Sequence, residues 1–180
     1  MSWIDSHCHL HAFYKKGKIQ EILMRASSAS VIQMISVGTT YEDWIIYREL
    51  TKQYSATINY SVGLHPCYVD KNWKQQTKYI PKFWQSNPRP CALGEIGLDY
   101  FHLPRDLEKS KQIVALQKTC LSFQLKIAKD LDCPIIIHSR NAFSDCISLI
   151  EANGVDWNKV VFHCFSEGKD EMEQLLNLGG

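Results

Sequence analysis

Short apolar runs rich in β-branched residues recur along the chain and alternate with stretches of helical spacing. The runs predict strands over residues 3–4, 31–37, 57–64, 91–98, 134–138 and 160–165. The stretches between and after them predict helices over residues 19–26, 44–50, 72–85, 107–131, 143–152 and 172–176. Strands that alternate with helices in this way indicate βα units around a parallel sheet.

Two architectures contain such units, the doubly wound open sheet and the (β/α) barrel. A doubly wound nucleotide-binding fold usually carries a glycine-rich phosphate loop after its first strand, and the chain has neither Gly-x-Gly-x-x-Gly nor Gly-x-x-x-x-Gly-Lys-Ser/Thr. Histidines and a glutamate stand instead near the ends of several strands, as in a barrel active site. We therefore expect an α/β fold of the TIM-type (β/α) barrel, with about six βα units present.

Composition places the chain among ordinary globular proteins. It has 180 residues, 45% of them hydrophobic and 22% charged, which suits one domain over residues 1–180. Its 20 basic and 19 acidic residues leave a formal charge of +1, too little for a protein that coats nucleic acid non-specifically. It contains no apolar run of the ~20 residues that a membrane span needs, and its first residues lack the regions of a secretion signal. We expect a cytoplasmic protein with no membrane partner.

The seven cysteines are scattered, and no two form a Cys-x-x-Cys pair. A structural zinc site would need paired cysteines at short spacing. We expect reduced thiols packed as small hydrophobic side chains.

Candidate metal ligands stand on different predicted strands. His7 and His9 are two residues apart, so in an extended segment they project the same way. His138 and His163 each end an apolar run, and Glu95 lies within one, where a carboxylate without a partner would be costly to bury. This donor set suits a hydrolytic site that holds Zn, Mn or Mg, with either one ion or two. Each histidine alone could equally be an ordinary core or surface residue, which is the role we expect for His11 and His102.

Five motifs, together with the segment Gln117 to Ala128, resemble the TatD family of metal-dependent deoxyribonucleases within the amidohydrolase superfamily. They are Ile4-Asp5-Ser6-His7-Cys8-His9-Leu10, Gly63-Leu64-His65-Pro66, Gly94-Glu95-Ile96-Gly97-Leu98-Asp99-Tyr100, His138-Ser139-Arg140 and His163-Cys164-Phe165-Ser166. The resemblance extends over essentially the whole chain. It implies a TIM-like barrel, two divalent metal ions (Zn, Mg or Mn) and hydrolysis of phosphodiester bonds in DNA, with strand ends as the expected substrate.

The resemblance also assigns roles to residues. It implies that the metal ligands are His7, His9, Glu95, His138 and His163, with Glu95 shared between the two ions. It places His65 and Arg140 near the substrate phosphate, so Glu95, His65 and Arg140 are the expected catalytic residues.

The chain departs from the family pattern at its C-terminal end. About six βα units are present where the family has roughly eight, so strands 7 and 8 and a late metal-binding Asp are expected to be missing. An incomplete barrel leaves open edges, through which the chain could associate with a second copy. Because the missing Asp would ordinarily accept the proton of the attacking water, slow turnover or none is expected. The alternatives are a related hydrolase of the same superfamily that acts on another ester or amide, and a shortened, non-catalytic relative.

Overall fold

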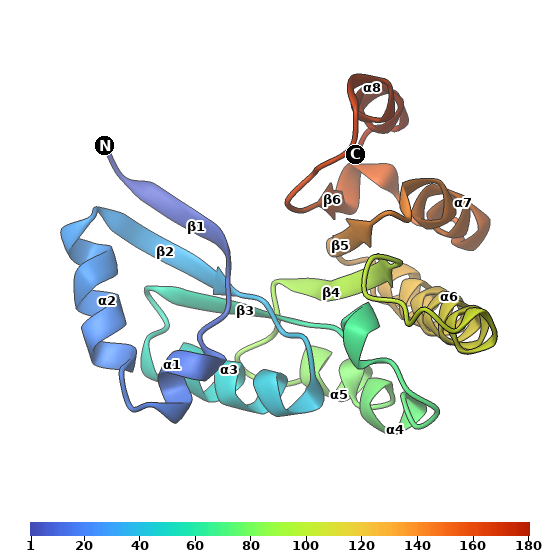
Figure 1. Cartoon of the computed structure of the whole chain (residues 1–180). Helices are drawn as coiled ribbons and strands as arrows, with labels where there is room; N and C mark the ends of the chain where they lie inside the picture. Colours follow the sequence, from blue (N-terminus) through green and yellow to red (C-terminus); the bar gives the residue numbers. More distant parts are fainter.

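Six parallel strands form a curled half-barrel in the computed structural model, which describes residues 1–180 (Figure 1). The strands are β1 (Trp3–Cys8), β2 (Val31–Ser36), β3 (Ile58–Val62), β4 (Ala92–Asp99), β5 (Ile135–Arg140) and β6 (Val160–Phe162). Each pairs in parallel with the next strand along the chain, so the order in the sheet is the order in the sequence. The predicted barrel architecture of about six βα units is confirmed.

The helices lie mainly on the convex side of the curled sheet (Figure 1). They are α1 (His11–Lys15), α2 (Ile19–Ser28), α3 (Tyr41–Gln53), α4 (Lys74–Thr77), α5 (Ile80–Trp84), α6 (Leu107–Leu131), α7 (Phe143–Asn153) and α8 (Lys169–Leu178), with 3-10 turns η1 (Pro66–Tyr68) and η2 (Trp157–Lys159). The long helix predicted over 107–131 has the expected bounds. None of the helices is long and apolar enough to cross a membrane.

Two helical segments differ from the prediction. The single helix expected over residues 72–85 is two short helices, α4 and α5. Pro81, in the first turn of α5, has no N–H to donate to the carbonyl of Thr77, so the hydrogen-bond ladder of one continuous helix is interrupted. Helix α1, which begins soon after β1 ends, was not predicted, because its five residues are too few to show the helical period of hydrophobic residues.

Local signals fix the start of two long helices. Thr40 precedes α3, and its side chain accepts from the backbone N–H of Asp43, whose own carboxylate accepts from the Thr40 N–H in return. Asp106 precedes α6 and accepts from the backbone N–H groups of Glu108 and Lys109. Such caps satisfy N–H groups that have no partner inside the helix.

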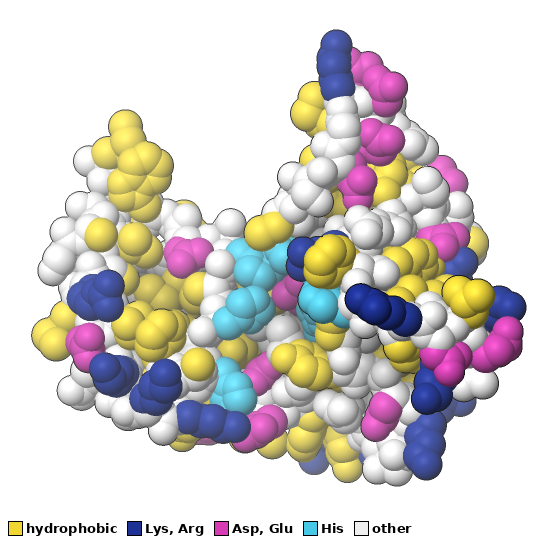
Figure 2. Space-filling model, in the orientation of Figure 1, with side chains coloured by type: hydrophobic (Ala, Val, Ile, Leu, Met, Phe, Trp, Pro, Cys, Tyr) yellow, Lys and Arg dark blue, Asp and Glu magenta, His cyan; other side chains and the backbone are white.

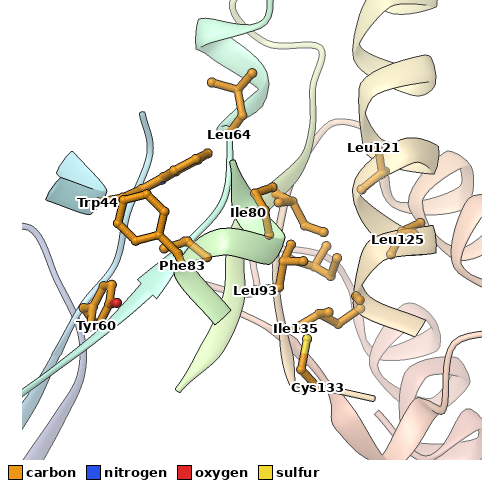
Figure 3. Close-up of a cluster of buried hydrophobic side chains, with 14 of the residues drawn as sticks. Trp44, Tyr60, Leu64, Ile80, Phe83, Leu93, Leu121, Leu125, Cys133 and Ile135 are labelled. Atoms are coloured by element: carbon orange, nitrogen blue, oxygen red, sulfur yellow. The ribbon is translucent and has the colours of Figure 1, made fainter. Parts of the chain in front are cut away.

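The hydrophobic core lies between the convex face of the sheet and the helices, where 29 buried residues form one cluster (Figure 3). Leu93 and Ile135 from the sheet meet Leu121 and Leu125 of α6 there. Trp44 of α3 and Trp84 of α5 are buried in the same cluster and pack these helices against the sheet. This packing holds the strands in place and leaves their carboxyl ends available for chemistry.

The two outer strands have open edges. Strand β1 pairs only with β2, and β6 pairs only with β5. Side chains on these strands are exposed, among them Trp3 (57%), Ile4 (60%) and Val161 (56%). Between them, the concave side of the sheet forms an apolar groove of about 730 Å³. The predicted open edges are therefore present.

The cysteine prediction is only partly correct. All seven cysteines are free, and Cys120, Cys133 and Cys146 are buried as expected. Three others are exposed, so the prediction that all pack as small hydrophobic side chains is wrong for Cys67, Cys91 and Cys164. These three lie in a turn or beside a strand end, where apolar neighbours in the sequence do not guarantee a covering layer.

Candidate metal centre

Histidines gather in the middle of the molecule, below the hollow between β1 and α8 (Figure 2). They come from the carboxyl ends of β1, β3, β5 and β6, and Glu95 lies within β4 among them. Parallel strands place their carboxyl ends at one edge of a sheet, so residues far apart in the sequence meet there. Most of these side chains line a pocket of about 420 Å³.

Glu95 is the centre of this group. Its side chain is only 3% exposed, and nitrogens of five imidazoles lie within 4 Å of its carboxylate. The distances to Oε1 are 2.6 Å from His163 Nε2, 2.9 Å from His138 Nδ1 and 3.3 Å from His65 Nε2, and those to Oε2 are 3.4 Å from His7 Nε2 and 3.8 Å from His9 Nε2.

The charge of Glu95 is set by these neighbours. Burial alone would raise the pKa of Glu95, but the hydrogen bond from His138 and the nearby imidazoles of His163, His65 and His7 hold it well below its usual value. Burial lowers the pKa of His9, which favours the neutral imidazole that binds metals. For His138, burial would lower the pKa, but hydrogen bonds to Glu95 and Asp99 raise it. The centre therefore combines an ionised carboxylate with nitrogen donors.

The nitrogen donors of this centre are better placed to bind divalent cations than to form hydrogen bonds with one another. His7 Nε2 and His9 Nε2 face each other at 3.2 Å, and the rings of His7 and His163 stack with centroids 4.1 Å apart. His7 Nδ1 and both nitrogens of His163 are buried without a partner in hydrogen-bonding geometry, although His163 Nε2 lies close to Glu95. A carboxylate has about four lone-pair sites, too few for five imidazoles. Unpaired nitrogen donors around an ionised carboxylate are what a cation site requires.

Two ligand groups share the Glu95 carboxylate. His7, His9 and Glu95 form one group, and His65, Glu95 and His138 form the other, with ligand atoms within 4.8 Å of one another in each. His7 lies inside β1 and His138 inside β5, whereas His9 and His163 follow their strands directly. The structure thus brings together all five residues predicted as metal ligands. His65, for which the resemblance implies a place near the substrate, lies among them.

Arg140 is the one predicted site residue outside this group. It is the last residue of β5 and is exposed, and its guanidinium lies over the ring of Phe101, 3.9 Å from the centroid. It makes no ion pair with the carboxylates of the centre.

Asp99 is a site residue that the sequence analysis missed. It is 1% exposed at the end of β4, and its Oδ2 lies 3.0 Å from His138 Nε2. Burial would raise the pKa of Asp99, but hydrogen bonds from His102 and His138 lower it to about 2. The signal was present, because Asp99 is four residues after Glu95 in the same strand, and alternate residues of a strand share a face.

Helix α6 fixes the backbone at two site segments. Gln124 accepts from the Leu64 N–H at 2.8 Å and donates to the Leu64 carbonyl at 3.2 Å, directly before His65. Gln117 makes the same pair of bonds with the backbone of Asp99, at 3.0 and 3.2 Å. Both glutamines are buried and stand seven residues apart, two turns of helix, so one face of α6 holds both segments.

A glycine allows β4 and β5 to approach closely beside the centre. Gly97 has φ +149°, and a Cβ at this position would overlap the carbonyl oxygen of His138. Only glycine adopts this backbone conformation without strain. It therefore keeps Glu95 and His138 on adjacent strands at contact distance.

Known proteins are similar to this chain in sequence and in fold. An uncharacterized metal-dependent hydrolase of Buchnera aphidicola is 31% identical over 182 residues, covering 99% of this chain and 65% of that protein. The crystal structure of YjjV, a TatD homologue from Escherichia coli, superposes with a TM-score of 0.85 at 28% identity, covering 98% of this chain and 65% of that one. A TatD family hydrolase from Entamoeba histolytica has the same fold, with a TM-score of 0.81 at 24% identity.

The chain spans about 65% of the length of these relatives. The sequence profile described as TatD related DNase matches residues 4–180, which is almost the whole chain. The match includes every residue of the Glu95 centre. The chain therefore belongs to the TatD related DNase family.

Proposed function

We propose that the chain carries the metal centre of a hydrolase that cleaves phosphodiester bonds in DNA. The observation that carries the proposal is the convergence of five imidazoles on one buried, ionised carboxylate at the carboxyl ends of the strands. Membership of a family of metal-dependent hydrolases supports it. A mouse relative, TATDN3, has a name that marks it as a candidate deoxyribonuclease, and it is 28% identical over 173 residues.

Two divalent cations, Zn, Mg or Mn, would be held on the two sides of Glu95. The proposed ligands are His7, His9, Glu95, His138 and His163, joined by His65. Divalent cations bound there would neutralise charge on the phosphate and lower the pKa of an attacking water. Donors of the imidazole and carboxylate type accept several metals, so availability would decide which is bound.

Asp99 would set the orientation of His138. With a cation bound, Asp99 Oδ2 would accept the Nε2 proton of His138, and Nδ1, on the side of Glu95, would be the ligating nitrogen. A histidine ligand held by a carboxylate in this way is a common arrangement around bound metals, and it keeps the ring in the ligating tautomer. Asp99 is in this proposal a positioning residue.

Exposed aromatic and basic groups beside the pocket suit a nucleic acid strand. Tyr68 is 54% exposed and lines the pocket, and Phe101 is 56% exposed beneath the Arg140 guanidinium. Aromatic side chains stack with bases, and guanidinium groups bind phosphates. Arg140 would bind a backbone phosphate while the aromatic rings receive unpaired bases at a strand end.

The proposal is tested by nucleotide release from single-stranded and duplex DNA in Mg²⁺, Mn²⁺ or Zn²⁺, with and without EDTA. Glu95→Gln removes the shared charge at constant size. Glu108→Gln is the matched control, because Glu108 is 78% exposed on α6 and pairs only with Lys111. We expect slow release in the wild type and in Glu108→Gln, and none with EDTA or in Glu95→Gln.

A parallel panel of phosphoesters, lactones and amides separates the alternatives. Release of nucleotides that neither EDTA nor Glu95→Gln reduces would refute the metal mechanism. Metal-dependent turnover of a panel substrate but not of DNA would favour another hydrolase of the superfamily. Metal uptake without turnover of any substrate would favour a non-catalytic relative.

A further inference from the structure

A second cluster of metal-binding side chains lies beside the Glu95 centre. It contains Cys67 in η1, Asp99 at the end of β4 and His102 in the turn that follows. Asp99 Oδ2 lies 2.9 Å from His102 Nδ1 and 3.5 Å from Cys67 Sγ, and Cys67 Sγ lies 3.8 Å from His102 Nδ1. Three different donor types therefore form a small triangle.

The size of this triangle matches a tetrahedral zinc site. Zinc bonds of about 2.0–2.3 Å to oxygen, nitrogen and sulfur separate neighbouring ligand atoms by about 3.3–3.6 Å. The observed separations of 2.9, 3.5 and 3.8 Å need shifts of only a few tenths of an ångström, and two of the three side chains lie on turns.

The geometry does not suit a cysteine nucleophile activated by histidine. Such a pair uses one ring nitrogen for the thiol and the other for an orienting carboxylate. Here Nδ1 of His102 is the atom nearest to both the thiol and Asp99. Three ligand atoms that all lie close to one another, as these do, are arranged to bind a cation.

The three ligands of this cluster differ in burial: one is buried and fixed, and two are accessible from solvent. Asp99 is 1% exposed and is held by the backbone N–H of His102, which donates to Oδ1, and by His138 at Oδ2. Cys67 is exposed and the His102 side chain is 55% exposed, so a cation can reach them from solvent. Asp99 is thus held in position before an ion binds, and Cys67 and His102 can move toward the ion when it arrives.

We propose that Cys67 Sγ, Asp99 Oδ2 and His102 Nδ1 bind a second type of cation, zinc, in a site with one position open to water. The thiol proton is released to solvent as the sulfur binds. The thiolate distinguishes this site from the Glu95 centre, because sulfur ligands favour zinc over magnesium and manganese. The proposal does not depend on nuclease activity. His138 contacts both Asp99 and Glu95, so the two sites are neighbours joined by one imidazole.

Titration of the 180-residue chain with Co²⁺ tests the site, because only a sulfur ligand gives a thiolate-to-cobalt charge-transfer band. We expect the band in the wild type, its loss in Cys67→Ser, and about tenfold or more weaker binding in His102→Ala. Cys91→Ser is the matched control, since Cys91 is also exposed but precedes β4, at the opposite end of that strand from Asp99. Glu95→Gln should keep the band, which separates this site from the proposed catalytic centre.

Elemental analysis of the zinc-loaded chain gives a second measurement, and we expect one zinc fewer per chain in Cys67→Ser than in Cys91→Ser. Thermal melts of the metal-free variants establish that each is folded. A wild type without the band at saturating Co²⁺, or a band that persists in Cys67→Ser, would overturn the proposal. An equal zinc content in the two cysteine variants would also overturn it.

Discussion

Replacing Gln124 by alanine removes both hydrogen bonds that hold the backbone of Leu64, at 2.8 and 3.2 Å. Leu64 is fully buried, so its N–H and carbonyl lose their partners where water has little access. Each unsatisfied buried group costs about 1–3 kcal/mol, which gives about 2–6 kcal/mol for the pair. A domain has a net stability of about 5–15 kcal/mol, so the loss is large. His65, the next residue, should also lose its fixed position.

Urea unfolding followed by circular dichroism measures this loss. If the free energy of unfolding falls by about 2 kcal/mol for each molar of urea, the urea concentration at the unfolding midpoint should fall by about 1–3 M. Gln112→Ala is the control, because Gln112 is exposed on the same helix. If Gln124→Ala unfolds at the same urea concentration as Gln112→Ala, with an unchanged slope, the clamp on Leu64 does not stabilise the fold and the reasoning is wrong.

Four further predictions have defined outcomes, three for substituted chains and one for the unchanged chain. The double change of His7 and His9 to alanine should abolish tight metal uptake and keep most of the helix content, and elemental analysis showing wild-type metal would contradict their role. Gly97→Ala should destabilise the fold by more than about 3 kcal/mol, through its φ of +149° and the steric overlap with β5, and wild-type thermal stability would exclude this. A hydrogen bond from Lys118 holds the pKa of Asp145 below its ordinary value, so its carboxylate stabilises the fold above pH ~3.9 and this contribution is lost as the pH falls through the lower, folded-state pKa. Asp145→Asn should therefore lower the urea midpoint at neutral pH and have less effect in strong acid, and an equal effect at both would argue against the ion pair. The 180-residue chain should self-associate through β1 and β6, because each leaves one row of backbone groups unpaired, and a cooperatively melting monomer in size-exclusion chromatography with light scattering would rule this out.

The sequence by itself determined the six strands and the longest helix, and it pointed to most residues of the centre. Apolar runs and helical spacing depend on near neighbours in the chain, so they predicted all six strands and the bounds of α6. The period of a strand placed His7 and His9 on one side, and the cost of burying Glu95 without a partner pointed to a cation. These inferences needed only the side-chain periods of strands and helices and the free-energy cost of removing a carboxylate from water.

Only the tertiary structure decided which side chains meet. Cys67 and His102 are 35 residues apart, and their contact depends on how two turns lie after β3 and β4. Whether a cysteine beside an apolar run is covered, as Cys120 is, or exposed, as Cys91 is, depends on the layer packed against it. The contact of His65 with the Glu95 carboxylate depends on tertiary structure for the same reason. The sequence pattern within a strand determines to which side of the strand a side chain points. The curl of the sheet and the packing of α6 determine how far that side chain lies from side chains on other strands.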